Sequence, residues 1–156
     1  MKKTIALLLA TVTCLVAGNA LAVGSNGLTA YGTYWDGENP GYGLGLKYSK
    51  SLLDIVSVDG RGTYIMFDDV ADTTMVPLEV AFNLGFPGPI TPYAGVGVGY
   101  YFIDNPLFDD ATGYFGQIGL EFTIVKVGVM AELRYMDLEG EYFDDLALNV
   151  GILLKF

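Results

Sequence analysis

The feature that most constrains this chain is an alternation of apolar and polar side chains that recurs in segments of roughly ten residues. Every second residue between 76 and 86 is apolar: Val76, Leu78, Val80, Phe82, Leu84 and Phe86. Successive side chains of a β-strand point to opposite faces, so this segment is predicted to be a strand with one apolar face. The segment 145–156 repeats the pattern and ends on Phe156. Each such face needs either lipid or a protein core.

Eight segments carry this pattern, and a tilted strand of about 9–11 residues is long enough to cross a bilayer. No segment after residue 22 offers the run of about 18 apolar residues that a spanning helix needs. We expect strands near 28–35, 42–48, 54–67, 76–86, 93–103, 114–123, 126–136 and 145–156. The predicted fold is all-β, an eight-stranded antiparallel up-and-down transmembrane β-barrel.

The first 22 residues are typical of a secretory signal peptide. Lys2 and Lys3 precede an apolar run over 5–16, and Ala20-Leu21-Ala22 offers the small-residue pattern that signal peptidase cleaves. The run is too short for a membrane-spanning helix. We therefore expect a signal peptide at 1–22 and an outer-membrane β-barrel domain over 23–156.

The processed chain would be strongly acidic. Of the eight lysines and arginines, Lys2 and Lys3 lie in the leader, so six remain against eighteen acidic residues, a net charge of −12. This charge excludes nucleic acid as a partner class. The chain has no histidine and its single cysteine, Cys14, is in the leader, which excludes disulfides and thiolate or imidazole metal sites. No cofactor is predicted.

The connections between the predicted strands alternate between short and long. The short ones, at 49–51, 87–89 and 124–125, have hairpin length. The longer ones carry thirteen of the eighteen acidic residues: Asp36, Glu38, Asp68, Asp69, Asp72, Asp104, Asp109, Asp110, Asp137, Glu139, Glu141, Asp144 and Asp145. Outer-membrane barrels have short periplasmic turns and longer external loops, so we expect the acidic end to face outward.

Aromatic residues cluster near the two ends of the predicted strands, where interfacial girdles are expected. The loop-side set is Tyr34, Trp35, Tyr42, Tyr100, Tyr114 and Tyr135, and the turn-side set is Tyr48, Phe86, Tyr93, Phe122 and Phe156. The β-propensity of aromatic residues alone would scatter them along the strands.

The leader, the stretch TPYAGVGVGY at 91–100 and the terminal LNVGILLKF at 148–156 carry a family resemblance. The mature chain resembles the small outer-membrane β-barrel proteins of the OmpA transmembrane-domain, OmpX and opacity-porin type. This resemblance implies a place in the cell outer membrane, among lipid and lipopolysaccharide. It also implies that Phe156 is the C-terminal assembly signal read by the barrel-assembly machinery. We expect a monomer, and any extracellular partner is unidentified.

Charged residues at inward positions are the first candidate functional residues. Eight strands enclose an interior that side chains can fill, and both charge signs are present, so we expect an internal ion network. A hairpin at 124–125 would place Gln117 opposite Glu132 and Phe115 opposite Arg134. The predicted lumen network comprises Lys47, Asp59, Arg61, Glu79, Gln117, Glu121, Glu132 and Arg134, with Lys155 as a further inward candidate. The network is either a static core, which we favour, or the gate of a narrow pore.

No catalytic residue is predicted. The missing histidine excludes a Ser-His-Asp hydrolase. Glu121 and Glu132 could still act as a general acid and base, but carboxylates inside barrels are usually structural.

The acidic loops offer the only candidate metal ligands. Clustered carboxylates suit Ca²⁺ or Mg²⁺, which could bridge them to lipopolysaccharide phosphates, but no calcium-loop spacing occurs. A solvated acidic surface is the favoured interpretation. The candidate cation contacts are Asp68, Asp69, Asp72, Asp109, Asp110, Asp144 and Asp145.

The predicted function is a non-enzymatic outer-membrane barrel with a structural, envelope or surface-interaction role and acidic extracellular loops. The alternative is a narrow channel for small solutes or ions. A barrel enzyme and a soluble lipocalin-like carrier are less favoured. The carrier should be polar outside, whereas the outer faces of 76–86 and 145–156 are wholly apolar.

Overall fold

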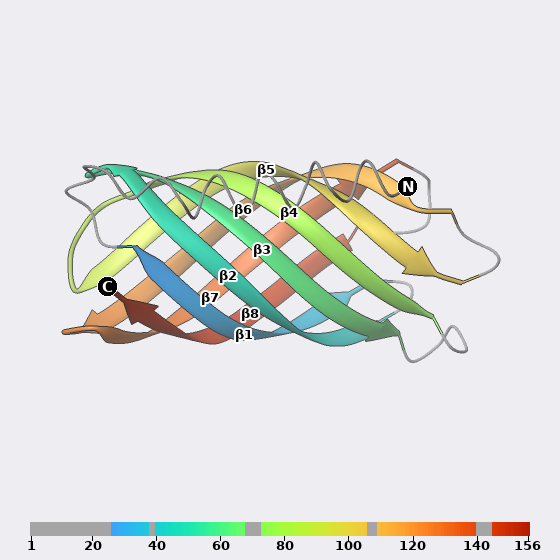
Figure 1. Ribbon diagram of the computed structural model, residues 1–156, viewed down its shortest axis with the longest axis horizontal. Helices are drawn as coiled ribbons and strands as arrows, with labels where there is room; N and C mark the ends of the chain where they lie inside the picture. Colours follow the sequence, from blue (N-terminus) through green and yellow to red (C-terminus); the bar gives the residue numbers. More distant parts are fainter. Residues whose placement is uncertain (1–25, 38–39, 68–72, 106–108, 140–144) are drawn as a thin grey trace.

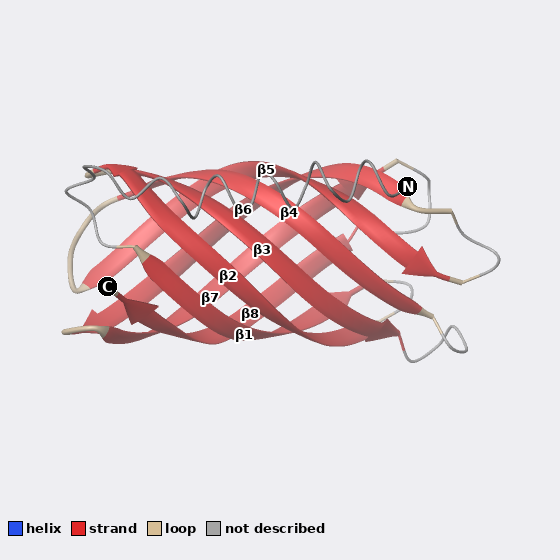
Figure 2. Cartoon of the chain, in the orientation of Figure 1, coloured by secondary structure: helices blue, strands red, loops and turns tan. Residues whose placement is uncertain are grey.

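The computed structural model describes residues 26–37, 40–67, 73–105, 109–139 and 145–156. Within these ranges all the regular structure is β-strand, as the cartoon in Figure 2 shows. None of these residues forms a helix long and apolar enough to cross a membrane.

The described ranges contain eight strands, each antiparallel to the next, and the first also pairs with the last. They are β1 (Gly27–Asp36), β2 (Gly41–Leu53), β3 (Val56–Phe67), β4 (Thr74–Gly85), β5 (Ile90–Asp104), β6 (Ala111–Ile124), β7 (Val127–Leu138) and β8 (Asp145–Lys155). Figure 1 shows steeply tilted strands around a single closed barrel. We call the end with the C-terminus and the tight turns the turn end, and the opposite end the loop end. The predicted eight-stranded up-and-down barrel is confirmed.

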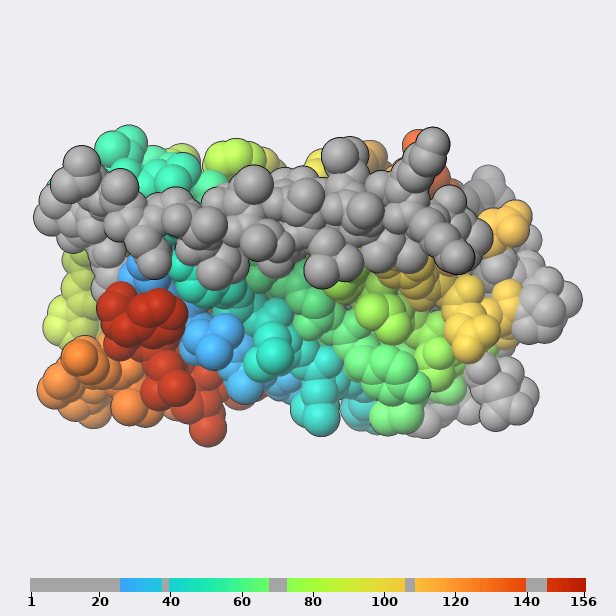
Figure 3. Space-filling view, viewed as in Figure 1, coloured from blue at the N-terminus to red at the C-terminus, as the bar shows by residue number. Residues whose placement is uncertain are grey.

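The outer surface of the barrel is apolar along most of its length. In β8 the outward residues are 43–61% exposed: Leu146, Leu148, Val150, Ile152 and Leu154. Between them, Ala147 and Asn149 are buried. In β4, Phe82 is likewise exposed and its neighbour Asn83 is buried. The strands therefore alternate as predicted, and Figure 3 shows side chains of neighbouring strands lying side by side on the part of the outer wall that is in view.

The turn between β2 and β3 is formed by Asp54 and Ile55, so the prediction of a turn at 49–51 is wrong. Residues 49–51 pair with 57–59 of β3, and a β-bulge precedes Leu53. Serine and lysine are common in turns, but their side chains are also accommodated in a strand near the polar mouth of a barrel.

The turn between β6 and β7 is Val125-Lys126, one residue later than predicted. The predicted register is wrong by two residues, because Gln117 lies opposite Arg134 rather than opposite Glu132. A shift of two residues keeps every side chain on its face, so the inward residues remain inward.

The β3–β4 ladder is interrupted near the loop end at Pro77. Pairing extends from Val56 to Gly62 and resumes at Ile65. Proline has no N–H to donate to a neighbouring strand, which accounts for the gap.

Two residues predicted in the aromatic girdles point inward instead. Trp35 is 1% exposed, and Tyr93 hydrogen-bonds Glu132 inside the barrel. Strand alternation places Trp35 on the same inner face as the buried Tyr31. The aromatic residues of the two groups that are exposed are Tyr34, Tyr42, Tyr114 and Tyr135 near the loop end and Phe86, Phe122 and Phe156 near the turn end.

Candidate functional site: the filled lumen

Glu132 of β7 is the centre of a polar network inside the barrel. Its carboxylate accepts hydrogen bonds from Arg61 at 2.5 Å, from the Tyr93 hydroxyl at 2.7 Å and from the Asn149 amide at 2.9 Å. The Lys47 ammonium is 3.6 Å away. Glu132, Arg61, Lys47 and Asn149 are all at most 5% exposed. Two cations and two neutral donors together offset the cost of burying this carboxylate.

Arg61 links Glu132 to neutral amides on β6 and β4. Its Nη2 donates to Gln117 Oε1 at 2.8 Å, and Gln117 Nε2 donates to Asn83 Oδ1 at 2.5 Å. Asn83 is on β4, so the chain of hydrogen bonds joins β7, β3, β6 and β4 across the interior. Such a network is rigid because each member fixes the next.

A second ion pair lies closer to the loop end. Arg134 donates to Glu79 at 2.5 Å, and the Tyr101 hydroxyl donates to the same oxygen at 2.7 Å. Phe115 pairs with Met136 in the backbone register rather than with Arg134, which corrects the predicted pairing. The Arg134 guanidinium nevertheless lies 4.1 Å from the centre of the Phe115 ring, within the range of a cation–π interaction.

The charges nearest the turn end are held more loosely. Lys47 is 3.8 Å from both Asp59 and Glu121, and Lys155 is 3.3 Å from Glu121. The side chains of Glu121 and Lys155 are 14% and 20% exposed, whereas Asp59 and Lys47 are buried. This part of the network faces the mouth of the barrel.

The lumen carries equal numbers of positive and negative charges among the residues that the structure describes. The cations are Lys47, Arg61, Arg134 and Lys155, and the carboxylates are Asp59, Glu79, Glu121 and Glu132. Mutual neutralisation of this kind makes buried charges tolerable.

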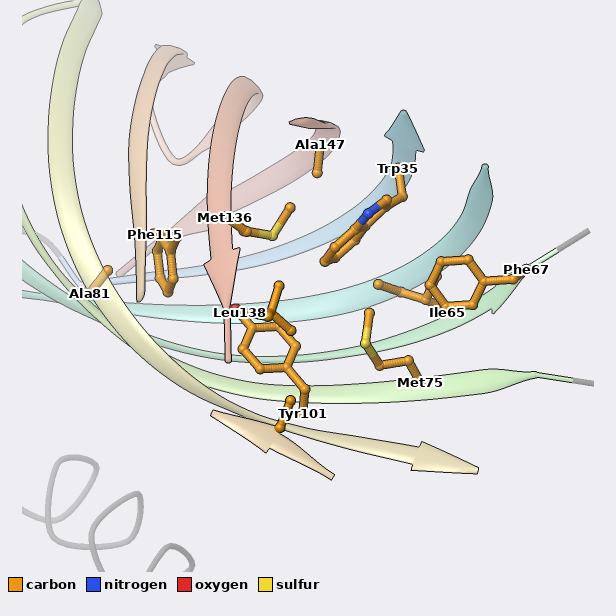
Figure 4. Packing of buried hydrophobic residues seen from close by; sticks show 11 residues of the cluster. Trp35, Ile65, Phe67, Met75, Ala81, Tyr101, Phe115, Met136, Leu138 and Ala147 are labelled. Atoms are coloured by element: carbon orange, nitrogen blue, oxygen red, sulfur yellow. The ribbon is translucent and has the colours of Figure 1, made fainter. Parts of the chain in front are cut away.

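The loop end of the lumen is closed by apolar side chains, which we call the apolar plug. It consists of Trp35, Ile65, Phe67, Met75, Met136, Leu138 and Ala147. Figure 4 shows these residues converging on the interior from the strands around it. Met75 and Met136 are fully buried, and the rings of Trp35 and Phe67 meet edge to face with their centres 6.2 Å apart. Close packing of this kind fills the loop end of the lumen with apolar side chains.

Glycines on the inner wall make room for the large lumen side chains. A Cβ on Gly97 would clash with the Phe115 ring, and one on Gly119 would clash with Tyr93. These glycines allow the ring of the paired residue on the adjacent strand to lie over the inner wall, where any other residue would overlap it.

The predicted lumen residues are brought together by the structure. All eight occupy the inner wall, and all except Glu121 are at most 5% exposed. The prediction missed Tyr93, Tyr101, Asn83 and Asn149, each of which hydrogen-bonds a predicted residue. Their inward strand positions are the available signal, because strand alternation puts all four on the inner face.

The candidate cation contacts are placed only in part. Asp109 and Asp110 are exposed just before β6, and both oxygens of Asp110 accept hydrogen bonds, from the Ile103 amide at 3.0 Å and the Tyr100 hydroxyl at 3.2 Å. Asp68, Asp69, Asp72 and Asp144 lie outside the described residues, as does the side chain of Asp145. No group of three or more potential metal ligands occurs in the described part of the chain.

Phe156 stands just after β8 at the turn end. Its backbone exchanges hydrogen bonds with Asn26 at 3.0 and 3.1 Å, which completes the β1–β8 seam. Its side chain is 63% exposed on the outer surface and its ring centre is 6.5 Å from that of Tyr48.

No protein-family model and no curated protein matches this chain. Among solved structures, the outer membrane protein OprG from Pseudomonas aeruginosa is similar, with a TM-score of 0.67 and 14% identity over 85% of this chain and 96% of that one. The N-terminal β-barrel domain of Pseudomonas aeruginosa OprF has a TM-score of 0.60 and 20% identity over 85% and 97% of the two chains. The outer membrane enzyme PagL has a TM-score of 0.51 and 16% identity over 83% and 98%.

These identities are too low to indicate a shared activity, and the similar structures include an enzyme. The similar structures establish the fold alone, which agrees with the closed antiparallel topology and the apolar outer wall of this chain. The chain has the fold of the small eight-stranded outer-membrane β-barrels.

Proposed function

We propose that this protein is a non-conducting, non-enzymatic barrel of the outer membrane that acts through its outer surfaces, in a structural or surface-interaction role. The observation that carries the proposal is that side chains fill the lumen at its loop end and in its middle. The apolar plug occupies the loop end, and a charge-neutral network crosses the barrel beneath it. A filled interior serves the stability of the wall and offers no route for solute.

Placement in the outer membrane is supported by the outer wall. Leucine, isoleucine and valine side chains on β8 are about half exposed, and such a surface needs lipid around it. The loop end would then face outward and the turn end would face the periplasm. Lipopolysaccharide and the barrel-assembly machinery remain predicted partners.

The surface available for contacts outside the cell is the acidic loop end. The exposed acidic residues described there are Asp36, Asp104, Asp109, Asp110 and Glu139. The turn end presents Lys126, which is also exposed. The turn end also exposes Asp54, so its exposed charges offset each other, whereas those described at the loop end are all acidic. A partner at the loop end is expected to be basic or to bind through divalent cations.

The proposal is tested by conductance. The protein is purified, its folding is verified by a heat-dependent shift on an SDS gel, and it is added to planar bilayers beside a sixteen-stranded porin as a positive control. We expect no discrete conductance steps from this protein, whereas the porin conducts. Reproducible steps that scale with the amount of folded protein would overturn the proposal and favour the narrow channel.

A role in the envelope is tested in cells of the source bacterium. Deleting the gene is expected to change the sensitivity of the cell to detergent or to chelation of divalent cations. Complementation with the wild-type chain should restore resistance. A triple variant, Asp104→Asn, Asp109→Asn and Asp110→Asn, which keeps the barrel, should restore less. Equal restoration by both chains would exclude the acidic loop end from the role.

A further inference from the structure

The lumen is not filled at the turn end, where a cavity of about 480 Å³ remains. Its walls include residues from all three tight turns, such as Asp54, Gly88 and Val125, and inner-face residues of the strands above them, such as Asp59 and Glu121. The cavity is therefore the mouth of the barrel, and we call it the vestibule. Its volume lies in the range of small-molecule sites.

The vestibule is lined by an excess of carboxylates. Asp54, Asp59 and Glu121 line it, whereas Lys155 is the only basic residue among its lining residues. Lys155 is already 3.3 Å from Glu121. Lys47 lies behind the wall, 3.8 Å from Asp59 and from Glu121.

Two of these carboxylates have unused capacity to accept hydrogen bonds. Asp59 is 2% exposed, yet neither it nor Glu121 accepts a hydrogen bond from any residue that the structure describes. The nearest cations to Asp59 are at 3.6 and 3.8 Å, which is an ion-pair distance but too long for a hydrogen bond. Buried carboxylates usually have donors, so the missing donors are expected to come from the vestibule itself.

The remaining lining narrows the class of ligand. Ser49 and Thr123 line the vestibule and their hydroxyls have no hydrogen-bond partner in the described part of the chain. Leu53, Ile55 and Leu153 add apolar wall. An anionic ligand would be repelled by the excess of carboxylates. A metal ion would lack a set of three ligands among the described residues.

We propose that the vestibule binds a small aliphatic amine, with its ammonium group donating to Asp59 and Glu121 and its hydrocarbon part against the apolar wall. Ammonium groups supply several donors together with the compensating charge. The inference is independent of the proposed function, because a conducting barrel would have the same vestibule.

The test is a titration of the folded protein in detergent micelles with 1,4-diaminobutane at low salt, followed by calorimetry and by amide shifts in NMR spectra. Butane-1,4-diol and succinate, of the same length but neutral or anionic, are the ligand controls. We expect the diamine to bind with a Kd of about 1 mM or below. The shifts should be confined to the vestibule, and the diol and succinate should not bind.

Three variants distinguish binding of the diamine in the vestibule from its non-specific attraction to an acidic protein. Glu121→Gln should weaken binding about tenfold. Lys155→Gln should tighten it, because Glu121 loses its competing partner. Asp104→Asn removes an exposed carboxylate from the opposite end and should leave the Kd unchanged.

Three results would overturn the proposal. They are no saturable binding up to about 10 mM diamine, equal binding of the diol, and a loss on Asp104→Asn as large as that on Glu121→Gln. Any of them would indicate a vestibule that holds only water.

Discussion

Replacing Glu132 by glutamine is expected to be among the most damaging single changes in the barrel. The substitution preserves the size of the side chain and removes only its charge, so the loss of stability contains no contribution from a cavity. Arg61, at 2.5 Å, and Lys47, at 3.6 Å, would then be buried cations without their central carboxylate. Removing one partner of a buried ion pair typically costs about 3–5 kcal/mol, and we expect a loss of that size in the free energy of unfolding.

Glu121→Gln is the matched control, because it is the same chemical change on the same inner wall. Glu121 is partly exposed and its cations lie at 3.3 and 3.8 Å without hydrogen bonds. The expected loss is about 1 kcal/mol or less, as for solvent-screened pairs. The difference between the two variants thus measures the effect of burial and hydrogen bonding.

The assay is reversible urea unfolding of the protein in lipid vesicles. Trp35 is the only tryptophan of the chain and is buried in the apolar plug, so its fluorescence reports the opening of the barrel. The pair Glu132→Gln and Arg61→Met completes a double-mutant cycle. We expect the double variant to lose about 2 kcal/mol less than the sum of the two single losses. Strict additivity, or a loss for Glu132→Gln no larger than that for Glu121→Gln, would refute the reasoning.

Three further predictions concern the backbone and the assembly of the barrel. Val125 has a φ of 59° at the first position of its hairpin turn, where glycine is preferred, so Val125→Gly should stabilise the protein by about 1 kcal/mol in the same urea assay. Unchanged or lower stability would contradict the strain. Gly97→Ala should cost about 1–3 kcal/mol because its Cβ would overlap the Phe115 ring, whereas Gly116→Ala, with open space around it, should be nearly neutral. Equal effects would refute the packing argument. Phe156→Ala should lower the amount of folded barrel in the outer membrane several-fold while leaving refolding in detergent micelles unchanged. A quantitative blot of membrane fractions, compared with the yield of refolding in micelles, tests this.

Much of the barrel could be predicted from sequence because one physical rule repeats in every strand. The alternation in β4 and β8 is regular, since the outer positions are apolar over 76–84 and 146–154, and the inner positions are small or polar except for Met75 and Leu153. The same parity puts Glu79, Asn83 and Asn149 on the inner face, where all three are buried. Strand parity alone decides whether a residue is on the inner wall. A register prediction that is wrong by an even number of residues therefore still assigns each residue to the correct face.

Turn positions and contacts across the lumen could not be predicted in the same way. Residues 49–51 look like a turn in composition, yet they pair with β3, because backbone hydrogen bonding outweighs the weak turn preference of serine. The contact between Arg61 and Glu132 joins strands that are not neighbours. Such a contact depends on how far each side chain extends across the barrel, and strand parity does not predict this.

Aromatic residues were the least predictable. Trp35 and Tyr93 have the composition of interfacial residues, but their parity puts them inside. An aromatic residue near a strand end can point outward into an interfacial girdle or inward into the lumen. Only its position in the alternation of the strand decides between the two.

The glycines of the inner wall limit how this protein can change over evolutionary time. Gly45 is compatible with Tyr31, and Gly119 with Tyr93, only as pairs, because a side chain gained on one strand overlaps a ring from its neighbour. A single substitution at either glycine would pass through an unstable intermediate unless the facing ring became smaller first. Related barrels are therefore expected to exchange size between adjacent strands in coupled steps, with the summed volume of each pair held nearly constant while the individual residues differ.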